Sequence, residues 1–128
     1  MSGGFTRMGL LYSLRGWLEM DDERCEQVRH IIEADEDALS HYRESWCFQT
    51  RGGGGTKFAF FGSVVRESGL SSIRRQVERI ATTVSSRDGD ITDFVSGVFH
   101  VTSEDETREI VWICRDGRFS ESVHEPGS

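Results

Sequence analysis

The sequence has little proline, little cysteine and no long apolar run. Its single proline, Pro126, lies near the C-terminus, which excludes proline-stiffened linkers between domains. Three cysteines without a CxxC spacing are not the even set that small secreted chains use as a disulfide framework. No stretch approaches the roughly 20 apolar residues that span a membrane. These absences predict a soluble, cytoplasmic protein with reduced thiols at Cys25, Cys47 and Cys114.

The length of 128 residues fits one domain, and we assign residues 1–128 to it. The terminal segments 1–6 and 125–128 are predicted to be flexible tails. Four consecutive glycines at 52–55 cannot sustain helix or strand cheaply, so they predict a flexible loop. The glycines do not match a phosphate-binding loop, because Thr56 precedes Lys57 and a strand pattern follows in place of a helix.

The net charge of −7 is unevenly distributed along the chain. Residues 19–37 hold nine acidic residues against two arginines, and residues 88–128 hold ten against three. Between these two acidic blocks, residues 38–87 hold eight basic and three acidic residues. Because nucleic acid and anionic membranes attract clustered positive charge, the acidic balance argues against both as direct partners. It favours a basic protein partner, which two acidic blocks would attract.

Alternation and helical periodicity predict the first half of the fold. Apolar residues alternate with polar ones over residues 9–20, which indicates a half-buried strand with Gly16 at a bulge. Asp21 or Asp22 is expected to cap a helix that follows. Its apolar stripe runs to residue 46, and the helix is expected to bend or split between Ala34 and Asp37. The stripe comprises Cys25, Val28, Ile32, Leu39, Tyr42 and Trp46.

The second half reads as a strand, a helix and three more strands. Residues 57–65 are apolar on both sides and predict a central strand. Ser71 or Ser72 is expected to cap a second helix. Three further strands are predicted near residues 94–102, 108–115 and 118–123. The sequence Asp116-Gly117 predicts a hairpin turn between the last two. The predicted class is α+β in the order β-α-β-α-β-β-β: one largely antiparallel sheet of about five strands with two amphipathic helices on one face.

The sequence contains no strong catalytic or metal-binding motif. Short ligand spacings typical of zinc sites are missing, and Ser40 stands where a calcium loop beginning at Asp35 needs glycine. No local signature of a nucleophile surrounds any cysteine. We therefore predict a non-enzymatic protein and assign no catalytic residue, no metal and no cofactor.

Recognition of another protein is the remaining chemistry. Aromatic side chains beside charges are typical of interface hot spots. Trp17 and Glu19 lie on the face of the first strand opposite its apolar set, and Trp46 lies close to the glycine loop. Together with the acidic segments, the predicted partner-binding residues are Trp17, Glu19, Asp35, Glu36, Asp37, Trp46, Glu104, Asp105 and Glu106.

Three local patterns occur in order between residues 9 and 119. They are Gly16-Trp17 late in the first strand, Phe60-Phe61-Gly62 in a central strand, and an acidic run before a tryptophan-bearing strand that ends in Arg115-Asp116-Gly117. In these features the chain resembles the small α+β immunity proteins of bacterial polymorphic-toxin and contact-dependent inhibition systems. The resemblance implies a stoichiometric toxin-binding inhibitor, cytoplasmic when the toxin acts on nucleic acid.

Two alternatives remain open. A phage-encoded inhibitor of a bacterial defence nuclease, similar to anti-CRISPR proteins, would need the same physical properties. A small-ligand-binding or enzymatic domain would instead hold a pocket between sheet and helices, with His100 and Arg115 as its polar groups. A homodimer that pairs through an exposed sheet edge is compatible with either function.

Overall fold

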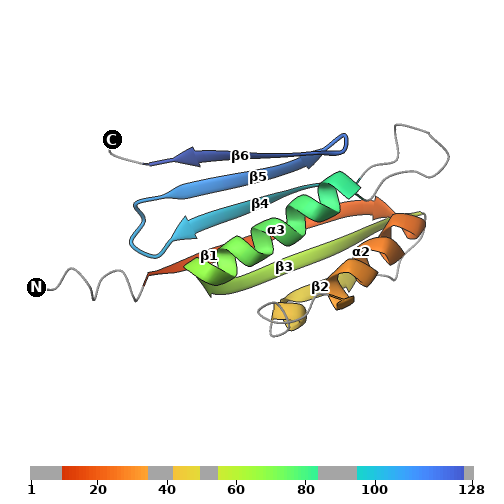
Figure 1. Ribbon diagram of the computed structural model, residues 1–128, viewed down its shortest axis with the longest axis horizontal. Coiled ribbons are helices and arrows are strands. Elements are labelled where there is room, and N and C mark those ends of the chain that lie inside the picture. Colours follow the sequence, from red (N-terminus) through yellow and green to blue (C-terminus); the bar gives the residue numbers. More distant parts are fainter. Residues whose placement is uncertain (1–9, 35–41, 50–54, 84–94, 126–128) are drawn as a thin grey trace, which may run out of the picture.

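The computed structural model describes residues 10–34, 42–49, 55–83 and 95–125. In chain order its elements are β1 (Leu11–Asp21), α2 (Asp22–Ala34), β2 (Trp46–Gln49), β3 (Thr56–Arg66), α3 (Glu67–Thr83), β4 (Ser96–Ser103), β5 (Glu109–Arg115) and β6 (Arg118–His124). The six strands form one sheet in the order β2-β3-β1-β4-β5-β6 (Figure 1). Every neighbouring pair is antiparallel. The α+β class and the antiparallel sheet are confirmed.

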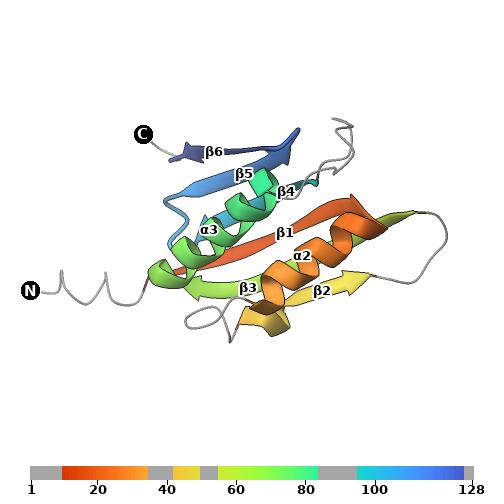
Figure 2. The same ribbon diagram turned by 45° about the vertical axis from the view of Figure 1, so that its right-hand side comes forward.

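Both helices lie on the same side of the sheet (Figures 1 and 2). The buried stripe of each helix packs against the buried side chains of the strands. These stripes include Val28 and Ile32 of α2 and Ile73, Val77 and Ile80 of α3. The largest fully buried side chains of the sheet are Trp112, Tyr12, Phe99, Leu14 and Leu18. One layer of helices on one layer of sheet therefore encloses the core.

The prediction of about five strands was wrong by one, and so was the element order. The missed strand is β2, which begins at Trp46, the last residue of the predicted helical stripe. Helix α2 ends at Ala34, and β2 pairs with β3 so that Trp46 lies opposite Phe61. Pairing with a distant strand overrides a local helical spacing, because a single buried aromatic fits either pattern.

Strand β1 lies at the centre of the sheet and pairs with β3 and β4 over nearly its whole length. Its register is continuous through Gly16, so β1 has no bulge there, contrary to the prediction. A Cβ at Gly16 would collide with the Phe99 ring and the Val98 carbonyl oxygen. The glycine therefore makes room for a buried aromatic side chain on the neighbouring strand.

The start of α2 and the last hairpin agree with the sequence predictions, whereas the start of α3 does not. The Arg24 N–H donates to Asp21 Oδ1 at 2.8 Å, so Asp21 caps α2. Asp116 and Gly117 both adopt positive φ, 55° and 75°, as a type I′ turn requires. Helix α3 begins at Glu67, directly after β3, and not at the predicted Ser71 or Ser72.

A polar contact ties α3 to the far edge of the sheet. Arg74 Nε donates to Glu121 Oε2 on β6 at 3.0 Å, and Trp112 Nε1 donates to the same oxygen at 2.9 Å. Partial burial acts to raise the pKa of Glu121, but the hydrogen bonds from Arg74 and Trp112 outweigh it, and the pKa lies below its usual value. The Glu121 carboxylate therefore stabilises the fold in its charged form.

Replacing Gly97 with alanine is expected to cost about 1–3 kcal/mol of unfolding free energy. A Cβ there would collide with the Trp17 carbonyl oxygen of β1, a backbone atom that cannot move without parting the strands. The matched control is Gly62→Ala in β3, where a Cβ meets nothing within 4 Å. Urea unfolding of both variants at low protein concentration checks the prediction. Equal stability losses would contradict the close approach of β1 and β4.

The variant Glu121→Gln is expected to lose about 0.5–1 kcal/mol at neutral pH, because glutamine keeps an acceptor for Trp112 but loses the charge that faces Arg74. The folded-state pKa of Glu121 is lowered, so its stabilisation is present above the usual value of 4.5 and is lost as pH falls through the folded pKa. Urea unfolding from neutral pH into acid should show the two proteins converging.

A control for this pH series is Glu78→Gln, which removes the carboxylate that contacts Arg74 within α3 at 3.3 Å. Its side chain is more exposed than that of Glu121, so a smaller loss is expected. A difference between wild type and Glu121→Gln that does not shrink in acid would show that the charge is not what stabilises this contact.

Candidate functional site

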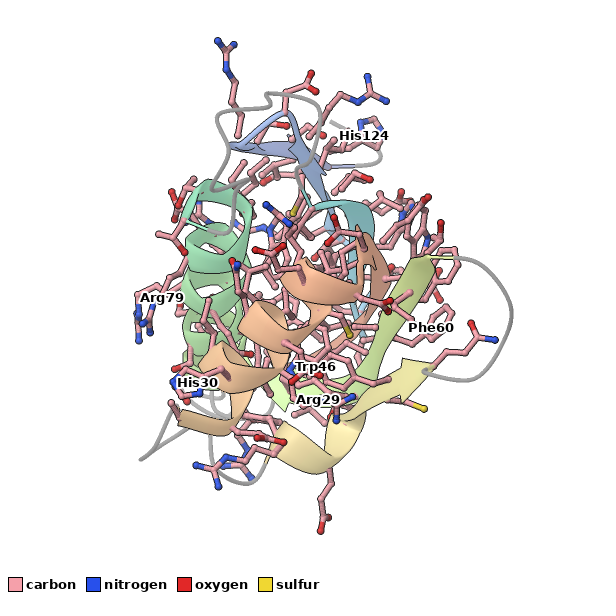
Figure 3. The ribbon with its side chains drawn as sticks, turned by 90° about the vertical axis from the view of Figure 1, so that its right-hand side faces the viewer. Arg29, His30, Trp46, Phe60, Arg79 and His124 are labelled. Atoms are coloured by element: carbon pink, nitrogen blue, oxygen red, sulfur yellow. The ribbon has the colours of Figure 1, made fainter. Side chains whose placement is uncertain are left out.

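The side of the sheet away from the helices is its open face. Successive residues of a strand point to opposite faces, so Leu14 and Leu18 enter the core while Arg15, Trp17 and Glu19 project from the open face. Figure 3 shows Phe60 of β3 pointing away from the helices. Phe60 is the register partner of Trp17, and paired residues of neighbouring strands project from the same face. The prediction that Trp17 and Glu19 lie opposite the apolar set of β1 agrees with this geometry.

Apolar side chains cross the open face in one row. Trp17 lies opposite Phe60 on β3 and Val98 on β4, and the register continues outward to Cys47 on β2 and Ile113 on β5. We call these five residues the open-face row. Trp17 is 36% exposed, and Phe60 and Ile113 are each 42% exposed. Large apolar side chains are therefore in water across the middle of the sheet.

Aromatic contacts hold the β1–β3 part of this face in a fixed arrangement. The rings of Trp17 and Phe58 meet edge to face with their centroids 6.3 Å apart. Phe58 and Phe60 stack with centroids 5.9 Å apart. Such pairs pack the rings against one another and restrict their rotamers, so this aromatic cluster is preorganised for contact.

Charged residues lie two positions before and two positions after Trp17 on β1. Arg15 Nη1 donates to Thr102 Oγ1 at 3.1 Å and to Ser13 Oγ at 3.3 Å, contacts that orient its guanidinium across β1 and β4. Glu19 lies on the other side of Trp17, opposite Phe58 on β3. The open face thus carries a cation and an anion, each two residues along β1 from its central tryptophan.

The acidic turn at residues 104–106 and the acidic residue Glu19 lie at opposite ends of β1. The Glu104 N–H donates to the Leu11 carbonyl at 2.9 Å, which places the acidic turn beside the first residue of β1. Glu19 lies eight residues further along β1, about 26 Å away at about 3.3 Å per residue. The exposed acids of α2 lie on the helix side, on a helix that begins directly after β1 and runs back over the sheet: Asp22, Glu23, Glu26 and Glu33. Asp35, Glu36 and Asp37 lie outside the described residues.

Asp105 organises the acidic turn. Its Oδ1 accepts hydrogen bonds from the Thr107 hydroxyl at 2.7 Å and the Ser103 hydroxyl at 2.8 Å. These bonds lower the pKa of Asp105, that from Thr107 most. Glu104 and Glu106 are exposed, and Glu106 has a φ of 59°. The turn therefore presents Glu104 and Glu106 to solvent, while Asp105 holds its shape.

Trp46 is in the core and not at the surface, which removes it from the candidate partner-binding residues. It is 7% exposed, and its indole N–H donates to Gln76 Oε1 at 3.1 Å. Its ring packs edge to face against Phe61, with centroids 5.1 Å apart. Figure 3 shows Trp46 between α2 and the sheet. The sequence offered both readings of this residue, because a tryptophan next to a loop is equally compatible with core and interface.

His100 and Arg115, the polar groups of the alternative pocket, project from the open face. The space between sheet and helices is filled by side chains that are fully buried, among them Leu14, Val77 and Phe99. These two residues therefore cannot line a pocket there. The main clefts of the described residues lie at the edges of the fold and do not include these two residues. One of about 500 Å³ lies between α2 and β2. One of about 410 Å³ at the start of β1 is lined by Tyr12, whose hydroxyl donates to Glu67 at 3.0 Å, and by Arg108.

The cysteines are free thiols in two kinds of environment. Cys114 is buried, and burial raises its pKa to about 12. Burial also raises the pKa of Cys25. Cys47 is exposed at the end of the open-face row. In the described ranges, no three histidine, cysteine or acidic side chains are grouped so that they could hold a metal ion.

The sequence predictions missed most of the open-face row. The sequence predicts a central strand for the run Phe58-Ala59-Phe60-Phe61, but it does not indicate which residues lie beside the outward aromatics. Extending the alternation of β1 to its neighbours would have placed Phe60 and Val98 beside Trp17, but only if the register were known. One signal was present in the sequence: residues 57–65 are apolar on both sides of the strand. In a sheet with helices on one face, this pattern indicates that apolar side chains also lie on the other face.

Comparisons with protein-family models, with curated proteins and with solved structures find no match to this chain. Neither helix in the described part is long and apolar enough to cross a membrane. The open face is therefore the feature of this chain from which a function can be inferred.

Adjacent phenylalanines of β3 test the assignment of the two faces. Phe61 is 3% exposed and Phe60 is 42% exposed. Phe61→Ala should cost about 3–5 kcal/mol of unfolding free energy, whereas Phe60→Ala should cost less than about 1 kcal/mol. Urea unfolding at low micromolar concentration measures both. Similar costs would show that residues of this chain cover the open face.

Proposed function

We propose that this protein is a non-enzymatic inhibitor that binds a partner protein through the open face of its sheet and thereby neutralises it. The observation that carries the proposal is the open-face row, an ordered set of aromatic and aliphatic side chains on a rigid sheet. Tryptophan and arginine are enriched among residues that dominate binding energy, and Trp17 and Arg15 lie together at the centre of this face.

The charges around the row support a protein as the ligand. Arg15 and Glu19 flank Trp17, and the exposed Glu104 and Glu106 lie at the end of the sheet where β1 begins. Mixed charges around an apolar centre are the usual composition of a protein interface. The net charge of −7 favours a basic partner, because opposite net charges speed encounter.

A toxin is the partner that the resemblance to immunity proteins implies, and a nuclease would be basic because it binds nucleic acid. Such an inhibitor acts by stoichiometric occupation, so it needs a stable surface and no reactive group. A phage-encoded inhibitor of a defence nuclease remains an equal alternative, since the same surface would serve it. The small-ligand alternative has less support, because His100 and Arg115 lie away from the helix side.

The test is capture of the partner from host cells by the wild-type protein and by Trp17→Ser. Loss of a buried hot-spot tryptophan costs 2 kcal/mol or more, so about 30-fold weaker binding of the captured protein is expected. Val123→Ser is the matched control: Val123 is 54% exposed but lies on β6 with its side chain on the helix side. Equal capture by all three proteins would contradict binding through the open face.

A second measurement separates inhibition from mere binding. The activity of the purified partner is titrated with this protein, and a linear loss that ends at one equivalent is expected of a stoichiometric inhibitor. A loss that continues with time at substoichiometric amounts would indicate turnover and would contradict the non-enzymatic proposal.

A further inference from the structure

We propose that the open face pairs with the open face of a second copy of this chain, in a dimer whose twofold axis follows the open-face row across the strands. The inference rests on the proposed function only in taking the open face as an interface. The second copy occupies the face while no other partner is bound, so dimer formation and partner binding exclude each other.

The charges on β1 select this axis. Arg15 and Glu19 are each two residues from Trp17 and project from the same face. A twofold axis across the strands at Trp17 reverses the strand direction, so Arg15 of each copy lies opposite Glu19 of the other. An axis along β1 would instead place arginine on arginine and glutamate on glutamate. The axis across the strands is favoured, because it forms two opposite-charge pairs where the axis along β1 would form two like-charge pairs.

The shape of β3 is self-complementary about the same axis. Phe58 and Gly62 are each two residues from Phe60, and all three face outward. The axis therefore places the Phe58 ring of one copy over Gly62 of the other, where no side chain fills the space within 4 Å of a Cβ position. A large ring facing a bare glycine permits close contact between the two sheets.

The face is large enough for a stable dimer. The sheet has six strands about 4.8 Å apart, and about seven residues along each strand rise about 3.3 Å per residue. The product of width and length is a flat area of roughly 600–700 Å², and side chains that project from the sheet add to it. Standard interfaces bury about 800 Å² per partner. Two twisted sheets packed in this way would form an aligned sandwich, a common arrangement of sheets with an apolar face.

Cys47 supplies a native probe of the arrangement. It lies opposite Phe60 at the β2 end of the open-face row, so the proposed axis brings the Cys47 side chains of two copies toward each other. Cys25 and Cys114 are buried, at 4% and 1% exposure, and will react slowly with thiol reagents. A short bismaleimide should therefore link two wild-type chains through Cys47, and Cys47→Ser should abolish the linkage.

The experiment that tests the dimer is a charge exchange on β1, measured by sedimentation from nanomolar to high micromolar concentration. Arg15→Glu and Glu19→Arg should each weaken dimerisation at least about tenfold, because each creates two like-charge pairs. The double variant Arg15→Glu/Glu19→Arg should restore the dimer and the Cys47 linkage. Glu33→Arg on the exposed side of α2 is the control and should leave dimerisation unchanged. Circular dichroism verifies that every variant folds.

The dimer is overturned if the wild type stays monomeric without a Cys47 linkage, or if the double variant fails to regain the affinity lost in the single ones. A monomer that still captures a partner through Trp17 would overturn the dimer and leave the proposed function in place. A dimer rescued by the double variant, without any Trp17-dependent partner, would support the dimer and contradict the proposed function.

Discussion

The alternation of side chains along β1 is the constraint on which the rest of the structure depends. Because β1 has hydrogen-bonded neighbours on both sides, its register assigns the residues of β3 and β4 to the same two faces. Both helices pack on one of these faces, so the other keeps its aromatic side chains in water. Core and candidate interface are thus two sides of a single sheet, one residue apart along each strand.

Local sequence patterns predict much of this fold. The alternation in β1, the Asp21 cap and the Asp116-Gly117 turn depend on residues close together in the chain, and they were predictable. Strand β2 was not, because its four residues become a strand only by pairing with β3. Trp46 shows the same limit: its spacing fits a helix, while its burial depends on Phe61 and Phe99, which lie far along the sequence.

The candidate site was partly predictable for the same reason. Trp17 and Glu19 follow from the alternation of their own strand, but the row that crosses the sheet requires the register between strands, which the sequence does not display. The acidic blocks illustrate the opposite error. Glu19 and the acidic turn at Glu104 belong to the two blocks, yet they lie about 26 Å apart, because β1 extends between them. The net charge of a segment of sequence therefore does not predict which charged residues lie close together in the structure.

The strand β3 places two sets of positions in strict alternation, with Ala59, Phe61 and Val65 inward and Phe58, Phe60 and Val64 outward. Selection can therefore act on the two sets separately. Substitutions in the outward set change the exposed surface at little cost in folding, while the inward set keeps the scaffold. A protein that must follow a changing partner gains from this separation, since new specificity can evolve by single steps without a loss of stability.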